Sequence, residues 1–386
     1  MRVLRQALAV AAALAATGAM AQVKVGIIAP FSGPFAHYGV LMKAGAEAYV
    51  ASQGGKLAGQ TVEFIFRDEG GPNPANTKTL AQELVVKEKV DYLGGIVFSP
   101  NAFSVAPVIQ ESKTPMVIFN AATSDITTKS DYYVRTSYTL WQVTVPIAQH
   151  AAKKGIKKVV TAVSDYAPGV DAETAFKAEF AKQGGQVVES IRMPVRTTDF
   201  GPFAQRIKAS GAQAVYVFLP GGPPNLGFVK AYQENGLRQA GVEFLGTAET
   251  DEFDLQKFGD SALGLQTAFH YSAAHDSAAN KAFVAALAKQ NKEAVANYAS
   301  VGAWDGMYVI HKMIEATGGK RDGDKAMAAA KALKWESPRG PVSIDPATRH
   351  ITQNVYLRTV EKGAGGMLVN KEIQSFGSHA DHGLGK

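Results

Sequence analysis

The sequence predicts an α/β protein in which parallel β-sheets are covered by helices on both faces. Strand-like and helix-like stretches alternate along almost the whole chain, and this alternation is typical of such sheets. The chain has 386 residues, which is long for a single domain. We therefore expect two domains of the same α/β kind.

The first strand is predicted at residues 23–28, an apolar and β-branched run. Proline, serine and glycine residues within positions 30–34 then shape a loop, and helix-forming residues follow from Leu41. In open α/β sheets, ligands bind beyond the carboxyl ends of the strands. We therefore expect this loop to form one wall of a ligand site, with Tyr38 at a surface or in a cleft.

The remaining strands and helices follow in alternation. Further strands are predicted at residues 62–67, 90–97, 116–119, 159–163, 187–191, 214–219, 244–246 and 265–270. Helices are predicted between them at residues 75–88, 102–112, 141–154, 170–184, 200–210, 224–236 and 276–290. A helix near residues 298–317 and a hairpin within residues 337–360 complete the pattern. Asn73 favours a helix start, while Gly184 and Gly236 favour helix ends.

The N-terminus predicts a secretory signal peptide over residues 1–21. Two arginines precede a short apolar run, and small residues at positions 19 and 21 fit cleavage before Gln22. No later stretch is long and apolar enough to predict a membrane span. We therefore expect a protein exported to a bacterial periplasm.

Composition excludes several classes of function. The chain has no cysteine, which excludes disulfides, thiolate metal sites and a cysteine nucleophile. The formal net charge is +6, but the lysines are scattered rather than clustered on one face. The sequence therefore gives no sign of nucleic-acid binding.

Several segments resemble the solute-binding proteins of ABC transporters, most closely the type I group that includes leucine/isoleucine/valine-binding proteins. They are VKVGIIAPFSGPFAHYG (23–39), VDYLGGIVFS (90–99), PMVIFNAATSDIT (115–127) and SDYAPGVD (164–171). The resemblance runs in order over nearly the whole mature chain. It implies two doubly wound parallel-sheet lobes, joined by three hinge crossovers, that close on a small-molecule ligand.

The resemblance also implies the limits of the lobes. The N-terminal lobe is expected to hold residues 22–140 and 272–334, and the C-terminal lobe residues 141–271 and 335–377. Residues 378–386 have little to bury and are expected to form a flexible tail.

The resemblance also implies individual ligand-binding residues in this sequence. Tyr38 is similar to an aromatic wall residue, and Ser99 to a serine whose hydroxyl and N–H hold a ligand carboxylate. Ser99 also fits a simple helix cap, and the two roles are compatible. The residues that the resemblance places at the site are Tyr38, Ser99, Ala121, Ala122, Thr123, Tyr166, Glu249 and Asp251. Further aromatic candidates, for which core packing explains the residue equally well, are Phe35, Phe98, His270 and Tyr271.

Two departures leave the ligand class open. Glu249 or Asp251 would pair with a ligand ammonium, but amino-acid binders tend to carry an acid where Ala248 stands. The loop at 219–225 is rich in glycine and proline, where amino-acid binders often offer an aromatic ring. Residues 336–358 are more similar to the subgroup associated with aromatic carboxylates. The ligand is therefore expected to be a hydrophobic amino acid or an aromatic carboxylate.

The expected function is capture of this carboxylate and its delivery to the permease of an ABC importer, by a monomer without cofactor, metal or catalytic residues. The alternative is a periplasmic α/β hydrolytic enzyme. The chain has no GxSxG motif, and its histidines are scattered in spacings that fit no metal motif. These features favour the binding protein.

Overall fold

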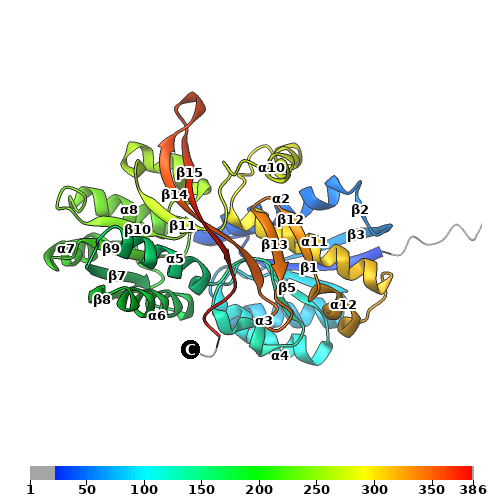
Figure 1. The fold of residues 1–386 in the computed structure, drawn as a ribbon. Coiled ribbons are helices and arrows are strands. Elements are labelled where there is room, and N and C mark those ends of the chain that lie inside the picture. Colours follow the sequence, from blue (N-terminus) through cyan, green and yellow to red (C-terminus); the bar gives the residue numbers. More distant parts are fainter. Residues whose placement is uncertain (1–21, 385–386) are drawn as a thin grey trace, which may run out of the picture.

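Two β-sheets form the cores of two lobes in the computed structural model, which describes residues 22–384 (Figure 1). The first sheet has the order β2-β3-β1-β4-β5-β6, and all its pairs are parallel except β2 with β3. Its strands are β1 (Gln22–Ala29), β2 (Lys56–Leu57), β3 (Gln60–Asp68), β4 (Tyr92–Gly95), β5 (Met116–Ile118) and β6 (Tyr133–Arg135). This sheet confirms the predicted parallel α/β architecture.

Helices pack against the first sheet in two groups. One group joins helices from distant parts of the chain, α2, α10, α11 and α12, and in the other α3 contacts α4. Their bounds are α2 (Ala36–Ser52), α3 (Pro74–Gln82), α4 (Ser99–Ser112), α10 (Ala278–Gln290), α11 (Tyr298–Thr317) and α12 (Gly323–Ala330). The predicted caps are confirmed: the Asn73 side chain accepts from Asn76 N at 3.2 Å, and Gly184 and Gly236 have positive φ.

The second sheet is built around β9, all of whose residues are buried. Parallel strands run in the order β11-β10-β9-β7-β8, and β14 adds to β11 in the antiparallel direction, with β15 beyond it. The strands are β7 (Lys158–Ser164), β8 (Gln186–Met193), β9 (Ala214–Phe218), β10 (Glu243–Gly246), β11 (Gln266–Phe269), β14 (Ile351–Lys362) and β15 (Leu368–His379). The helices are α5 (Leu140–Lys153), α6 (Ala167–Lys182), α7 (Gly201–Ala209), α8 (Pro223–Glu234) and α9 (Glu252–Leu255).

The chain passes between the two sheets three times. The first passage lies between β6 and α5, and the second between β11 and α10. The third lies within β14, whose first residues pair with β13 (Gly340–Ile344), while residues 356–359 pair with β11. Figure 1 shows β14 and β15 running together across both lobes.

The third passage, expected near residue 335, follows two short strands that contact the first lobe. β12 (Lys334–Ser337) and β13 lie beside α11 of the first lobe, where the Trp335 ring stacks on Tyr308 at 4.8 Å. Trp335 Nε1 also donates to Asp305 Oδ1 at 2.9 Å. At residue 335, the expected boundary, the Trp335 ring and its N–H therefore both have partners on α11, while β12 and β13 continue through β14 into the second sheet.

Part of the segment predicted as a flexible tail, residues 378–386, makes specific contacts with the rest of the chain. β15 continues to His379. The buried Asp381 carboxylate then accepts from Ser124 Oγ at 2.8 Å and from Thr139 Oγ1 at 2.7 Å. The partners of this polar segment are buried hydroxyl groups from distant parts of the chain, and the sequence of the segment does not predict them.

Helix α2 begins at Ala36, five residues before the expected start, so Tyr38 lies on its first turn rather than in a loop. A short 3₁₀ turn at Gly33–Phe35 leads into it, with Pro34 in the first-turn position that suits proline. Gly39 N donates to Pro30 O at 3.1 Å. A Cβ at Gly39 would lie 2.3 Å from that oxygen, so this approach needs glycine.

The predicted signal peptide, residues 1–21, lies outside the described residues. Within the described part of the chain, no helix is long and apolar enough to cross a membrane.

Candidate functional site

A small cavity lies between the lobes, at the carboxyl ends of strands from both sheets. Its volume is about 20 Å³, room for a single water molecule. Four tyrosines and two phenylalanines dominate its walls, and among residues 22–384 none of the lining side chains is charged. The lining residues are Tyr38, Val97, Phe98, Asn120, Ala122, Tyr138, Tyr166, Pro168, Phe218, Leu219, Pro220, Ala248 and Tyr298.

Tyr38 joins the two lobes at this cavity. Its hydroxyl lies 2.5 Å from the Tyr298 hydroxyl on α11, and it accepts from Gly221 N of the second lobe at 3.0 Å. Burial raises the pKa of Tyr38 well above its ordinary value, so the hydroxyl stays protonated at neutral pH. The wall therefore offers neutral hydroxyl groups on apolar rings.

Ser99 and the loop after β5 form a polar corner beside the cavity. Ser99 is the first residue of α4, and its Oγ accepts from Thr123 N at 3.2 Å. Phe98 and Ala122, the residues just before them, line the cavity itself. Among the described residues, the buried Thr123 Oγ1 has no hydrogen-bond partner. Because helix N-termini attract anions, this corner is suited to a carboxylate.

Two other candidates of the first lobe are buried near the cavity without lining it. Ala121 is buried behind the wall, where its N–H donates to Ile96 O at 3.1 Å. Phe35 is buried against the Phe98 ring at 5.0 Å. Neither of them lines the cavity.

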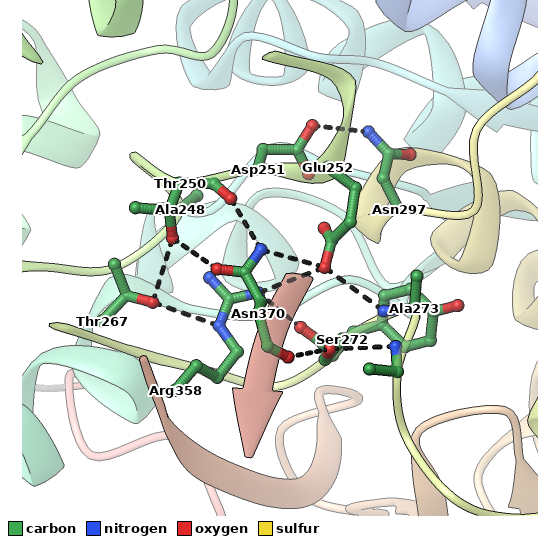
Figure 2. Close-up of polar contacts among 12 residues, drawn as sticks. Ala248, Thr250, Asp251, Glu252, Thr267, Ser272, Ala273, Asn297, Arg358 and Asn370 are labelled. Atoms are coloured by element: carbon green, nitrogen blue, oxygen red, sulfur yellow. Dashed lines mark hydrogen bonds and ion pairs between the residues drawn. The ribbon is translucent and has the colours of Figure 1, made fainter. Parts of the chain in front are cut away.

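The two acidic candidates of the second lobe do not line the cavity and have other partners. Glu249 Oε1 accepts from Leu219 N at 3.1 Å, and its Oε2 accepts from Thr247 N. Asp251 Oδ1 accepts from Phe253 N at 3.1 Å. It also accepts from Asn297 Nδ2 at 2.9 Å (Figure 2). Burial raises the pKa of Glu249 to about 7, and it raises that of Asp251 well above its ordinary value. Both carboxyls thus hold loops together, and Ala248 alone of this segment lines the cavity.

Tyr166 lies in the cavity wall, but His270 does not. His270 Nδ1 lies 3.1 Å from Arg339 Nη1, and burial together with that cation holds the His270 pKa well below its ordinary value. Tyr271 is buried and donates to Asn280 Oδ1 at 2.9 Å. Both residues therefore belong to the second passage between the lobes.

Sequence reasoning missed several lining residues, among them Asn120, Tyr138, Phe218 and Tyr298. Tyr298 is the first residue of α11, just after the N-cap Asn297. The apolar pattern of that helix predicts core packing, so the sequence does not single out Tyr298 as a ligand-site residue. Tyr138 lies in the first passage between the lobes. These residues lie just after strands or at the start of a helix that faces the first loop, and such positions favour a ligand site.

Glu69, behind the wall, should make stability depend on pH. It is buried and accepts from Asn101 Nδ2 at 2.7 Å, and burial raises its pKa to about 8. Between its ordinary pKa and about 8, the folded state holds a proton that the unfolded chain has lost, so stability should fall as pH rises from about 5 to 8. Urea unfolding at several pH values across this range measures the slope of the free energy of unfolding against pH.

Glu69→Gln should flatten that slope, because glutamine resembles the protonated carboxyl. Glu315→Gln is the matched control, since the Glu315 side chain is 52% exposed and its pKa is lowered by Lys312 rather than raised. An unchanged slope in the Glu69 variant would contradict the assignment.

A two-lobed α/β protein with an uncharged cavity between its lobes has the architecture of a binding protein that closes on a small solute. The chain belongs to the periplasmic binding protein family, whose model matches residues 22–365. Leu/Ile/Val-binding protein homolog 6 of Brucella melitensis is 56% identical over 374 residues, covering 96% of each chain.

Solved structures of ABC transporter solute-binding proteins are also similar. One, from Rhodopseudomonas palustris in complex with 4-hydroxybenzoate, has a TM-score of 0.92 and 58% identity, covering 94% of this chain and 99% of that one. Another, from R. palustris BisB5 in complex with 3,4-dihydroxybenzoic acid, has a TM-score of 0.90 and 44% identity over the same shares. The predicted role as the solute-binding component of an ABC importer is confirmed, and the alternative of a hydrolytic enzyme is wrong.

Proposed function

We propose that the interlobe cavity binds an aromatic carboxylate of the hydroxybenzoate class. The observation that carries this proposal is the wall itself, which presents four tyrosines and two phenylalanines and, within the described chain, no charged side chain. Aromatic walls favour a flat ring through apolar burial and ring contacts. The tyrosine hydroxyls suit a ring that carries a polar substituent.

The same wall disfavours an amino acid. A ligand ammonium buried without an anionic partner is strongly unfavourable. Glu249 and Asp251 already accept hydrogen bonds from protein groups, and the nearest cavity position of that segment is Ala248. The similar proteins solved with 4-hydroxybenzoate and 3,4-dihydroxybenzoic acid support the same ligand class.

The ligand carboxylate is proposed to sit at the corner formed by the α4 N-terminus and the loop after β5. Ser99, Ala122 and Thr123 surround this corner with hydroxyl groups and backbone N–H groups. Hydrogen bonds to a charged group contribute about 1.5–3 kcal/mol each. Tyr38 and Tyr166 would then hold the ring from opposite lobes.

A cavity of about 20 Å³ has no room for a ring, so we propose that the lobes open for ligand entry and close around it, with wall side chains adjusting. Closure favours the state in which both walls touch the ligand. The protein is proposed to act as a monomer, exported through its signal peptide, that delivers the acid to a permease.

Thermal unfolding with candidate ligands tests the proposed class. At 1 mM, 4-hydroxybenzoate or benzoate should raise the melting temperature, because a ligand that binds only the folded state stabilises it. Leucine should leave the melting temperature unchanged. A shift with leucine and none with either aromatic acid would contradict the proposal.

A further inference from the structure

We propose that Asp251 and Asn297 form a closure latch, an interlobe hydrogen bond that sets ligand affinity although neither residue lines the cavity. The proposal rests on the proposed function, because it assumes that binding requires the lobes to close. Its partners come from opposite lobes. Asp251 caps α9 after β10 of the second sheet, and Asn297 caps α11, which packs on α2 and contacts β4 and β5.

The latch is a well-formed contact. Asn297 Nδ2 donates to Asp251 Oδ1 at 2.9 Å, and the two residues are 1% and 4% exposed. Beside it, the His37 ring of the first lobe stacks on the Phe253 ring of the second at 4.5 Å, with the planes 12° apart. The N-cap and the first turn of α9 therefore each contact the first lobe.

Each half of the latch adjoins a wall of the cavity. Asn297 immediately precedes Tyr298, and Asp251 follows Ala248 by three residues, while Tyr298 and Ala248 both line the cavity. Asp251 N also donates to Ala248 O at 3.0 Å. Joining Asp251 to Asn297 thus holds a wall segment of each lobe at the separation seen in this structure.

A second group of contacts supports the latch from behind (Figure 2). Glu252 Oε1 accepts from Asn370 Nδ2 at 3.1 Å and from Ala273 N at 3.2 Å. The buried Arg358 donates to Thr247 O at 3.0 Å and to Tyr271 O at 2.6 Å. The loop that carries Asp251 is therefore fixed to the second passage between the lobes.

A bond that exists only between closed lobes raises the closed fraction. Because the apparent affinity scales with the fraction of protein in the binding-competent state, loss of the latch should weaken binding without changing any ligand contact. We expect up to about tenfold weaker binding, because one hydrogen bond contributes about 0.5–1.5 kcal/mol and about 1.4 kcal/mol corresponds to tenfold in Kd.

Two variants delete the latch and keep both helix caps. In Asp251→Ser and Asn297→Ser, the serine hydroxyl still caps α9 or α11, but it is too short to reach the opposite lobe. Each should raise the Kd for 4-hydroxybenzoate up to about tenfold by calorimetry, and the double variant should lose no more than either single one. Asp251→Asn is the conservative control, because its amide oxygen can accept both bonds, and it should bind like the wild type.

A structural role for these caps would lower the ligand-free melting temperature, whereas the latch predicts a change in Kd at a nearly unchanged melting temperature. An unchanged Kd in both serine variants, or additive losses in the double variant, would overturn the latch. If the wild type fails to bind 4-hydroxybenzoate, the proposed function fails instead. The latch is then judged by small-angle scattering of the ligand-free variants, where it predicts a larger radius of gyration and an unchanged radius refutes it.

Discussion

Arg339→Met should lower the free energy of unfolding by about 3–5 kcal/mol, the usual effect of removing one partner of a buried ion pair. Arg339 Nη2 lies 2.7 Å from Asp305 Oδ2, and the side chains are 0% and 1% exposed. Arg339 Nη1 also donates to Ser137 O at 3.1 Å and to Gln353 Oε1 at 2.9 Å. Methionine would leave the Asp305 carboxylate buried without its cation. It would also remove the contacts by which Arg339 joins the three passages between the lobes, at Ser137, His270 and Gln353.

Urea unfolding of the ligand-free protein measures this effect. Arg206→Met is the matched surface control, because Arg206 is 56% exposed beside Glu189 and should cost less than about 1 kcal/mol. Adding Asp305→Asn to Arg339→Met should recover part of the loss, since no unpaired charge then stays buried. Equal destabilisation by the Arg339 and Arg206 variants would show that the buried pair is unimportant.

Ala248→Asp should weaken binding of 4-hydroxybenzoate by about 100-fold. Ala248 is buried in the cavity wall, where no described lining residue is charged. At an effective dielectric of about 20, two negative charges about 5 Å apart repel each other by about 3 kcal/mol, which corresponds to about 100-fold in Kd. The same change adds the acid that amino-acid binders tend to carry at this position.

Calorimetry with 4-hydroxybenzoate tests this effect, with Ala248→Ser as the control. Serine is small and neutral, so it should keep an affinity close to that of the wild type. If the aspartate variant binds 4-hydroxybenzoate as tightly as the serine variant, then the ligand carboxylate and Ala248 do not share one cavity.

Much of the fold could be predicted because strand and helix patterns alternate so regularly. The predicted strand at residues 214–219, for example, is the fully buried centre of the second sheet. The course of the C-terminal residues could not be predicted, because it depends on contacts across the chain. Trp335 is held by Tyr308 and Asp305, and Asp381 by hydroxyls more than 200 residues away.

The candidate site divides in the same way. Four of the predicted residues lie in the cavity wall: Tyr38, Phe98, Ala122 and Tyr166. They could be predicted because they lie near strand ends and because the family resemblance places them at the ligand. Glu249 and Asp251 do not lie in the wall, because nearby backbone N–H groups and Asn297 bind their carboxyls. Sequence spacing alone cannot tell an acid that faces a ligand from one that holds a loop.

Whether the cavity binds an aromatic carboxylate is best measured by calorimetric titration of the purified mature protein with 4-hydroxybenzoate and, separately, with leucine. We expect saturable binding of one 4-hydroxybenzoate per chain and no binding heat with leucine. Saturable binding of leucine with none of 4-hydroxybenzoate would contradict this expectation.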